Sequence, residues 1–484
     1  MRGCVVPELV PSVADRVISK SKYISGLQCH KLLWHQYNAK DLIPPYDASH
    51  QAVFDQGHEV GRRARLLYPG GVLIERERWE MDGLLADTTQ ALQLGMPIYE
   101  AALLGGGVYA QVDILAPTGD DGWDIIEVKS STSVKSVHLD DVAVQRFAAE
   151  RAGIRIRRCL LAHIDSTYVR SSDIDNAKLF RLVDITDDVD DRLVGLADRI
   201  AALAAVIVQA DSPDVAIGSH CTSPYDCPMK PVCWKAMPEE NVTRLVGGDK
   251  QVIQVEAARS RQTHVDQARV HDFLGRLTYP LFFLDFETFG TAVPLLDGVR
   301  PYQQVPFQFS LHVRRDAGGA LTHHGFLADG PADPRQQLLD EMRAHLESAG
   351  SIVVYFAGFE TGRLTELARD FPAYAPWIET IIGRVVDLHA PFKAFDVYHP
   401  LQNGRTSIKS VLPALTGSGY EGMAIADGGT ASQTFLRIAS GAGPEGQAID
   451  DVAAVRKDLE AYCELDTLAM VRILDVIERL ARLC

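Results

Sequence analysis

A predicted β-hairpin at residues 107–129 constrains the fold of this chain more than any other segment. Residues 107–116 and 123–129 read as strands, and the polar turn at residues 118–122 joins them. Two strands joined by so short a turn pair in antiparallel fashion, so the positions that face one another can be counted outward from the turn.

The hairpin carries acidic and basic side chains that the pairing would bring together. Counting from the turn places Asp113 across from Ile126 or Glu127, and strand alternation puts Glu127 and Lys129 on one face. Two carboxylates and an ammonium group at one spot could bind a divalent metal ion and polarise a phosphate. The alternative is a surface hairpin that carries a simple Glu–Lys pair.

Composition limits the classes of function without choosing one. At 484 residues the chain is long enough for two or three domains, and no apolar run approaches the roughly 20 residues of a membrane span. The beginning of the sequence lacks the apolar region of a signal peptide, so we expect a cytoplasmic protein. The formal net charge of −16 argues against tight non-specific nucleic-acid binding, although clustered metal-binding carboxylates would themselves make a protein acidic.

Composition along the chain predicts two domains separated by a charged segment. We expect the first domain at residues 1–235, with an opening helical region, the hairpin and a cysteine cluster. Residues 236–280 are rich in charge and Gln and read as a linker with a connecting helix. The second domain, residues 281–484, opens with an apolar strand at 281–284 and ends in a long amphipathic helix.

Three cysteines within thirteen residues indicate a metal centre. Cys221, Cys227 and Cys233 are separated by five residues each, and the prolines between them suit a rigid loop. Cys29, far upstream, is a candidate fourth ligand. Four thiolates could hold an iron–sulfur cluster or a zinc ion. The alternative is a set of unrelated buried cysteines, because the spacing matches neither of the common zinc-knuckle patterns.

Taken in order, these residues resemble a RecB-type PD-(D/E)XK nuclease domain with an iron–sulfur clasp. The resemblance rests on Cys29, Asp113, Glu127, Lys129, Gln145 and the closing cysteines Cys221, Cys227 and Cys233. It implies a [4Fe–4S] cluster that ties the first helix of the domain to its C-terminal segment. It further implies that Asp113 and Glu127 hold Mg²⁺ or Mn²⁺, that Lys129 positions the attacking water, and that Gln145 completes the site. His58 is the candidate for a further metal ligand.

The second half contains its own acidic pattern. Asp285 and Glu287 directly follow the apolar strand and share a face, because they are two positions apart on a strand. Tyr462 and Asp466 are four residues apart on a predicted helix, on the side that carries its apolar stripe. A carboxylate that faces inward needs a partner, and a metal ion is a good one. Capping or surface acids are the alternative at each position.

These residues resemble the DnaQ-like 3′→5′ exonucleases of the DEDD group, which have an RNase H fold. The resemblance implies that Asp285, Glu287, Glu360 and Asp466 bind two metal ions and that Tyr462 orients the attacking water. The third motif departs from the family pattern: Glu360 stands where Asp is usual, and Phe356 stands where Asn is usual. We interpret Asp387 either as a residue that supports the metal ligands from behind or as structural, and Lys409 either as a phosphate contact or as a solvated lysine.

The whole layout resembles a family of largely uncharacterised bacterial proteins that join these two kinds of domain. We therefore expect an α/β protein with a restriction-endonuclease-like core and iron–sulfur clasp, followed by an RNase H-like exonuclease fold. The expected activity is metal-dependent hydrolysis of nucleic acid, with DNA preferred to RNA, in repair, processing or defence. The chain has no Walker loop, so unwinding would need a helicase or another partner. The alternative is a non-catalytic nucleic-acid-binding or redox-sensing iron–sulfur regulatory protein.

Overall fold

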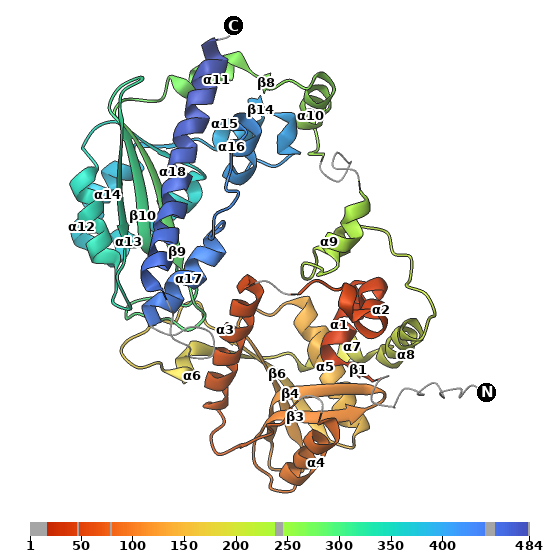
Figure 1. The fold of residues 1–484 in the computed structure, drawn as a ribbon. Helices are drawn as coiled ribbons and strands as arrows, with labels where there is room; N and C mark the ends of the chain where they lie inside the picture. The colour runs from red at the N-terminus through yellow and green to blue at the C-terminus, as the bar shows by residue number, and fades with distance from the viewer. Residues whose placement is uncertain (1–16, 46–47, 78–79, 238–244, 441–450, 483–484) are drawn as a thin grey trace, which may run out of the picture. The chain divides into compact units, whose positions relative to one another are not determined.

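The computed structural model of this protein describes residues 17–45, 48–77, 80–237, 245–440 and 451–482. The chain divides into two compact units. The first comprises Met1–Met237 with Ala292–Pro301, and the second comprises Pro238–Thr291 with Tyr302–Cys484. Both units combine helices with a β-sheet (Figure 1). The α/β class predicted from the sequence is therefore confirmed.

The first unit is built on a seven-stranded sheet in the order β2–β3–β4–β5–β6–β7, with β1 paired to β4. Its strands are β1 (Ile18–Ser19), β2 (Val72–Leu73), β3 (Ile98–Gly105), β4 (Val108–Pro117), β5 (Trp123–Lys129), β6 (Ile156–Ile164) and β7 (Phe180–Asp184). Its helices are α1 (Lys20–Gln28), α2 (His30–Asn38), α3 (Ala48–Arg65), α4 (Met81–Leu92), α5 (Ser136–Arg151), α6 (Asn176–Leu179), α7 (Thr186–Leu193), α8 (Leu196–Ile207) and α9 (Lys230–Cys233).

Strands β4 and β5 form the predicted hairpin. β5 has the predicted bounds, and β4 begins and ends one residue later than predicted. The strands pair in antiparallel fashion, with Ile114 opposite Ile126. The next positions in that register are Asp113 and Glu127, so Glu127 is the one of the two predicted partners that faces Asp113.

The second unit contains a five-stranded sheet in the order β11–β10–β9–β12–β13, and a small sheet of β8 and β14. Its strands are β8 (His264–Val265), β9 (Leu281–Phe289), β10 (Val305–Arg314), β11 (Leu321–Leu327), β12 (Ser351–Val354), β13 (Val385–Asp387) and β14 (Val397–Tyr398). Its helices are α10 (Asp249–Ser260), α11 (Gln267–Leu274), α12 (Arg335–His345), α13 (Ala357–Asp370), α14 (Ala375–Ile382), α15 (Ala390–Ala394), α16 (Ile408–Thr416), α17 (Gly428–Ser440) and α18 (Val452–Arg482).

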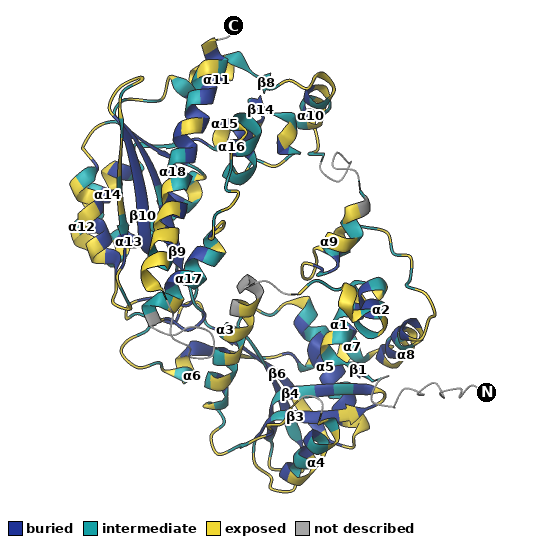
Figure 2. Ribbon diagram, in the orientation of Figure 1, coloured by how far each residue is buried: buried dark blue, intermediate teal, exposed yellow. Residues whose placement is uncertain are grey.

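Central strand β9 separates two apolar cores. Leu281 and Phe283 pack with α11, α16 and α18, whereas Phe282 packs on the other face with α12, α13 and α14 (Figure 1). Strands β9 and β10 are buried along almost their whole length (Figure 2). Because side chains alternate along a strand, Asp285 and Glu287 extend from the face that α18 covers.

Helix α18 presents its acidic and apolar residues to that face as predicted. Its 31 residues include Tyr462 and Asp466, both buried, followed on the same stripe by the fully buried Ala469 and Ile473. Across the described residues, no helix has both the length and the apolar character that crossing a membrane requires.

The segment predicted as a linker with one connecting helix contains more regular structure than expected. Helices α10 and α11 and strand β8 all lie within residues 236–280. Val270 and Phe273 of α11 pack in the α18-side core of the second unit. Ala257 of α10 packs with Phe395 and Tyr398. The apolar side chains of these two helices, rather than the charged residues between them, therefore determine where this segment packs.

Candidate active sites

Glu127 is the centre of a buried ionic cluster in the first unit. Its side chain is 1% exposed. It accepts hydrogen bonds from Lys129 Nζ at 2.6 Å, from Gln145 Nε2 at 2.6 Å and from Lys20 Nζ at 3.1 Å. Strand β5 supplies Glu127 and Lys129, α5 supplies Gln145, and α1 begins with Lys20. This burial argues against the alternative of a simple pair on a surface hairpin.

A further carboxylate, Asp141, completes the cluster. It lies one helical turn before Gln145 on α5, with Oδ2 2.6 Å from Lys129 Nζ and Oδ1 3.8 Å from Lys20 Nζ. Burial raises the pKa of Asp141. Burial acts in the same direction on Glu127, but the ammonium groups of Lys129 and Lys20 outweigh it and hold the pKa of Glu127 well below its usual range. Glu127 is therefore ionised at neutral pH.

Asp113 connects this cluster to a cavity of about 750 Å³ that is also lined by Lys20, His58 and Glu100. Asp113 Oδ2 accepts a hydrogen bond from the backbone N–H of Val128 at 2.7 Å. Burial, and next the charge of Glu127, raise the pKa of Asp113 to about 7. Glu100 has a left-handed backbone with φ of +57°, a conformation that is uncommon outside glycine and often occurs at functional sites.

Four of the five predicted residues of the first site are thus close together, and the fifth, His58, lines the cavity that Asp113 also lines. Asp113, Glu127, Lys129 and Gln145 form a continuous group through their contacts and electrostatic interactions. His58 lines the same cavity as Asp113 from helix α3, where its side chain is exposed.

The four predicted cysteine ligands gather beyond the end of α1. Cys29 follows α1 directly, and Cys29, Cys227 and Cys233 share a small apolar cluster. Burial raises the pKa of Cys227, and the neighbouring thiols of Cys29, Cys221 and Cys233 raise it further. Gln28 Nε2 donates hydrogen bonds to two backbone carbonyl oxygens of the cysteine loop, each at 2.7 Å. The last residue of α1 thereby fixes the loop beside Cys29.

In the second unit, four carboxylates from three elements line one cavity of about 500 Å³. Asp285 and Glu287 come from β9, Glu360 from the first turn of α13, and Asp466 from α18. Glu287, Glu360 and Asp466 are 6%, 2% and 7% exposed. All four acids predicted for this site are therefore brought together, including Glu360 of the altered third motif.

The electrostatics of these carboxylates are unfavourable when all are ionised. Burial, and next the charge of Asp466, raise the pKa of Asp285 well above its usual range. Burial, and next the charge of Asp285, do the same for the pKa of Glu287 and of Glu360. Glu360 Oε2 is buried without a hydrogen-bond partner. The group therefore requires either protons or added cations.

Two tyrosines and a lysine complete the second cavity. Tyr420 O–H donates a hydrogen bond to Asp466 Oδ1. Burial raises the pKa of Asp466 to about 6, although hydrogen bonds from Tyr420 and Tyr462 act against the shift. Lys409 Nζ lies 5.2 Å from the ring centroid of Tyr462 and donates to the carbonyl oxygen of Ala426 at 2.6 Å. Lys409 is thus held at the cavity rather than free in solvent.

Comparison with known proteins assigns one segment of this chain to a family model. Residues 282–407 match a domain of unknown function, DUF2779. The match begins at the second residue of β9 and ends at the residue before α16, and so includes Asp285, Glu287 and Glu360 but neither Lys409 nor α18. No curated protein matches the chain.

Asp387 has the structural role that was predicted for it. Its Oδ1 accepts hydrogen bonds from the backbone N–H groups of Phe356 at 3.0 Å and His389 at 2.9 Å. Phe356 has a left-handed backbone with φ of +78° and is the residue before α13. By fixing this turn, Asp387 determines the direction in which α13 starts and hence the position of Glu360.

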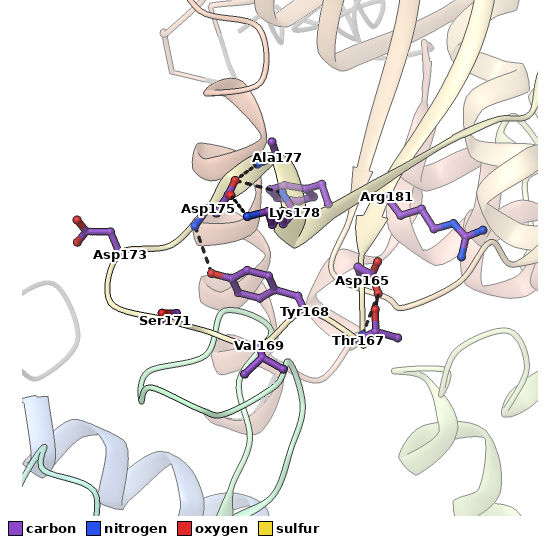
Figure 3. Close-up of a pocket in the computed structure, with 11 residues that line it drawn as sticks. Asp165, Thr167, Tyr168, Val169, Ser171, Asp173, Asp175, Ala177, Lys178 and Arg181 are labelled. Atoms are coloured by element: carbon purple, nitrogen blue, oxygen red, sulfur yellow. Dashed lines mark hydrogen bonds and ion pairs between the residues drawn. The ribbon is translucent and has the colours of Figure 1, made fainter.

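A further cavity, of about 760 Å³, lies in the first unit between residues 165 and 181 (Figure 3). Two of its three acidic side chains are engaged by their own loop. Asp165 Oδ1 accepts from the backbone N–H of Thr167 at 2.8 Å, and Asp175 pairs with Lys178 at 3.0 Å. The hydroxyl oxygen of Tyr168 accepts a hydrogen bond from the backbone N–H of Asp175 at 3.2 Å. These contacts account for Asp165 and Asp175 as turn-forming groups.

Sequence reasoning missed Lys20, Asp141, Glu100 and Tyr420. The helical period could have identified Asp141, because it precedes Gln145 by four residues on one face. Pairing of β3 with β4, in which Tyr99 faces Ile114, could have identified Glu100 as the neighbour of Asp113. Lys20 and Tyr420 reach their sites through long-range packing, which leaves no local pattern in the sequence.

Proposed function

We propose that this protein is a metal-dependent nuclease that hydrolyses phosphodiester bonds, with DNA cleaved from single-stranded ends as the expected substrate. The second unit would contain a DnaQ-like, RNase H-like exonuclease site, and the first unit a RecB-like PD-(D/E)XK site. The observation that carries the proposal is the group of four carboxylates that line one cavity of the second unit, Asp285, Glu287, Glu360 and Asp466, of which the last three are buried.

The donor set of that group suits Mg²⁺ or Mn²⁺. Both ions prefer carboxylate oxygens, and four carboxylates held in one cavity offer several at once. The raised pKa values and the unpartnered Oε2 of Glu360 indicate that the ionised group lacks sufficient positive charge. A bound divalent ion stabilises the charge that develops on a phosphate and lowers the pKa of the attacking water.

The altered third motif does not remove its carboxylate from the group. Glu360 replaces Asp with a longer side chain, and it lines the same cavity as Asp285 and Glu287. Tyr462 borders that cavity and hydrogen-bonds Asp466, which suits a group that orients water. Lys409, held by the carbonyl oxygen of Ala426, is suited to contact a phosphate oxygen. The cavity is within the size range of sites that enclose small ligands, as a terminal nucleotide requires.

The first site would work under a different electrostatic constraint. Asp113 and Glu127 would hold the metal ion there, with His58 available at the same cavity. Gln145 fixes the orientation of the Glu127 carboxylate through its 2.6 Å hydrogen bond. Because Glu127 is already paired with two ammonium groups, metal binding must compete with them. We therefore expect the first site to bind metal more weakly than the second.

The cysteine quartet would hold a [4Fe–4S] cluster. Four thiolates could hold an iron–sulfur cluster or a zinc ion. The thiols are close enough to raise the pKa of one another, and the resemblance to a RecB-type domain with an iron–sulfur clasp favours the cluster.

The proposal is tested with a substrate panel on the full chain, supplied with Mg²⁺ or Mn²⁺. Labelled single- and double-stranded DNA and RNA, with free or blocked 3′ ends, are incubated with wild type, Glu127→Gln and Asp285→Asn. We expect Asp285→Asn to abolish stepwise cleavage from free 3′ ends. Glu127→Gln should keep that activity and should abolish the cleavage that Asp285→Asn retains.

Two matched control variants also remove one carboxylate charge each, but at positions away from both sites. Glu150→Gln lies on α5, where Glu150 pairs with Arg146 at the surface, and Glu379→Gln lies on the exposed side of α14. Both should retain wild-type cleavage. If metal-loaded wild type leaves every substrate intact, or if both site variants cleave as wild type does, the proposed function is wrong and a non-catalytic role is favoured.

A further inference from the structure

A second group of potential metal ligands lies on the five-stranded sheet, at residues that neither proposed nuclease site uses. His312 on β10 and His323 on β11 are directly opposite each other in the antiparallel register, and their rings are 4.6 Å apart between centroids. Glu464 on α18 completes the group. One donor atom from each of the three residues lies within 4.8 Å of the other two.

Hydrogen bonds fix the two imidazole rings and leave one nitrogen of each available. His312 Nδ1 lies 2.7 Å from Thr467 Oγ1, and His323 Nε2 lies 2.9 Å from Ser310 Oγ. His312 Nε2 and His323 Nδ1 are the remaining ring nitrogens, and His323 Nδ1 is 3.9 Å from Glu464 Oε1. A histidine that binds a metal ion commonly has its other ring nitrogen held by such a partner, which sets its tautomer and orientation.

The same hydroxyl groups are linked to each other. Ser310 Oγ and Thr467 Oγ1 are 2.6 Å apart and both residues are buried, so the two rings are anchored through one continuous chain of hydrogen bonds. His312 is 4% exposed, whereas the side chains of His323 and Glu464 are 32% and 49% exposed. The group therefore has a fixed inner ligand and two outer ligands that solvent can reach.

We propose that His312, His323 and Glu464 form a binding site for Zn²⁺, separate from the carboxylate group on the other side of α18. Two imidazole nitrogens and one carboxylate are a common ligand set for Zn²⁺, with water in the fourth position. Zinc bound at about 2.0–2.1 Å needs its donors about 3.3 Å apart, so a small movement of the exposed His323 and Glu464 side chains completes the geometry.

A metal ion at this position would join α18 to β10 and β11. Glu464 lies two residues before Asp466 and on a different side of the helix. The ion would thus hold the helix segment that carries Tyr462 and Asp466 against the sheet, without contacting the carboxylate cavity itself.

The test measures zinc bound by the full chain after equilibrium dialysis against low micromolar Zn²⁺ with excess Mg²⁺. Metal content per chain is compared for wild type, His323→Ala, Glu464→Gln and the control His324→Ala, which alters the next residue on β11. Other zinc sites contribute equally to all four proteins, so the difference from wild type isolates this site. We expect one equivalent less zinc in His323→Ala and Glu464→Gln, and the wild-type amount in His324→Ala.

A fifth protein, Ser310→Ala, keeps all three ligands but removes the anchor of His323. It should need about 10–100 times more free Zn²⁺ for half-saturation, the usual effect of losing such a partner. Equal zinc content in all the proteins would overturn the proposal, and would leave His323 and Glu464 as an ion pair. An equal loss in His324→Ala would overturn it as well.

Discussion

Lys20 Nζ lies 3.1 Å from Glu127 Oε1, although 107 positions separate the two residues in the sequence. Strand pairing explains the contact. β1 runs parallel to β4, with Ser19 opposite Tyr109, and α1 begins at the next residue. The position of the Lys20 ammonium is therefore set by the sheet that also carries Asp113 and Glu127.

Replacing Lys20 with alanine should weaken the first unit. Glu127 would keep Lys129 and Gln145 but lose one of its two ammonium partners while 1% exposed. We expect the free energy of unfolding to fall by about 1–3 kcal/mol, measured by urea denaturation. Lys22→Ala is the matched control, because Lys22 lies on the same helix but contacts the ring of Tyr37 at 3.6 Å. Equal losses in the two variants would contradict this role.

Replacing Glu360 with glutamine should raise the stability of the metal-free protein but weaken its metal binding and its cleavage activity. The variant removes one of four repelling charges with little change in shape. In the presence of a chelator, we expect the midpoint of thermal unfolding to rise by about 2–4 °C for each kcal/mol of repulsion relieved. The affinity for Mn²⁺ and the cleavage rate should instead fall about 10–100-fold. Glu379→Gln should change none of these quantities, and a lower midpoint for Glu360→Gln would argue against the repulsion.

Metal-free protein should lose stability in the second unit as pH rises. The pKa of Asp466 is raised from 3.8 to about 6, so its protonated form stabilises the fold below pH 3.8 and this stabilisation is lost as the pH passes through about 6. The difference in the free energy of unfolding between wild type and Asp466→Asn should change by about 3 kcal/mol across that window, measured by denaturation with chelator present. A difference that is constant with pH would be inconsistent with the burial of this acid.

Removing one cysteine of the quartet should remove its metal without affecting other cysteines. Cys227→Ser should lose iron and the brown colour of anaerobically purified protein, and should unfold at lower temperature because a cluster that links distant segments stabilises the fold. Cys159→Ala is the control, since Cys159 is buried in the main core of the first unit. Zinc in place of iron in the wild type would correct the identity of the metal, and no metal at all would refute the centre.

Local patterns were sufficient to predict the elements that carry the acids. Alternation and the polar turn predicted β5 with its observed bounds, because both strands of the hairpin are adjacent in sequence. The four-residue spacing of Tyr462 and Asp466 predicted their common buried face on α18. In each case the residues that determine the element are close to it in the sequence.

Long-range contacts explain what the sequence alone could not predict. The packing of α10 and α11 on the second unit depends on apolar partners such as Phe395, more than 100 positions away. Tyr420 reaches Asp466 from a loop after α16, and no period in the sequence connects the two. The pairing of His312 with His323 became visible only once the register of β10 and β11 was known.

Helix α1 has nine residues, with Lys20 at its start and Cys29 directly after its end. Its length is about 14 Å at 1.5 Å per residue. Gly26 fits so closely against Leu203 that an added Cβ would lie 2.9 Å from that side chain, so the helix has little freedom to shift sideways. The helix whose last residue holds the cysteine loop is therefore the same rigidly packed helix whose first residue places an ammonium group against Glu127.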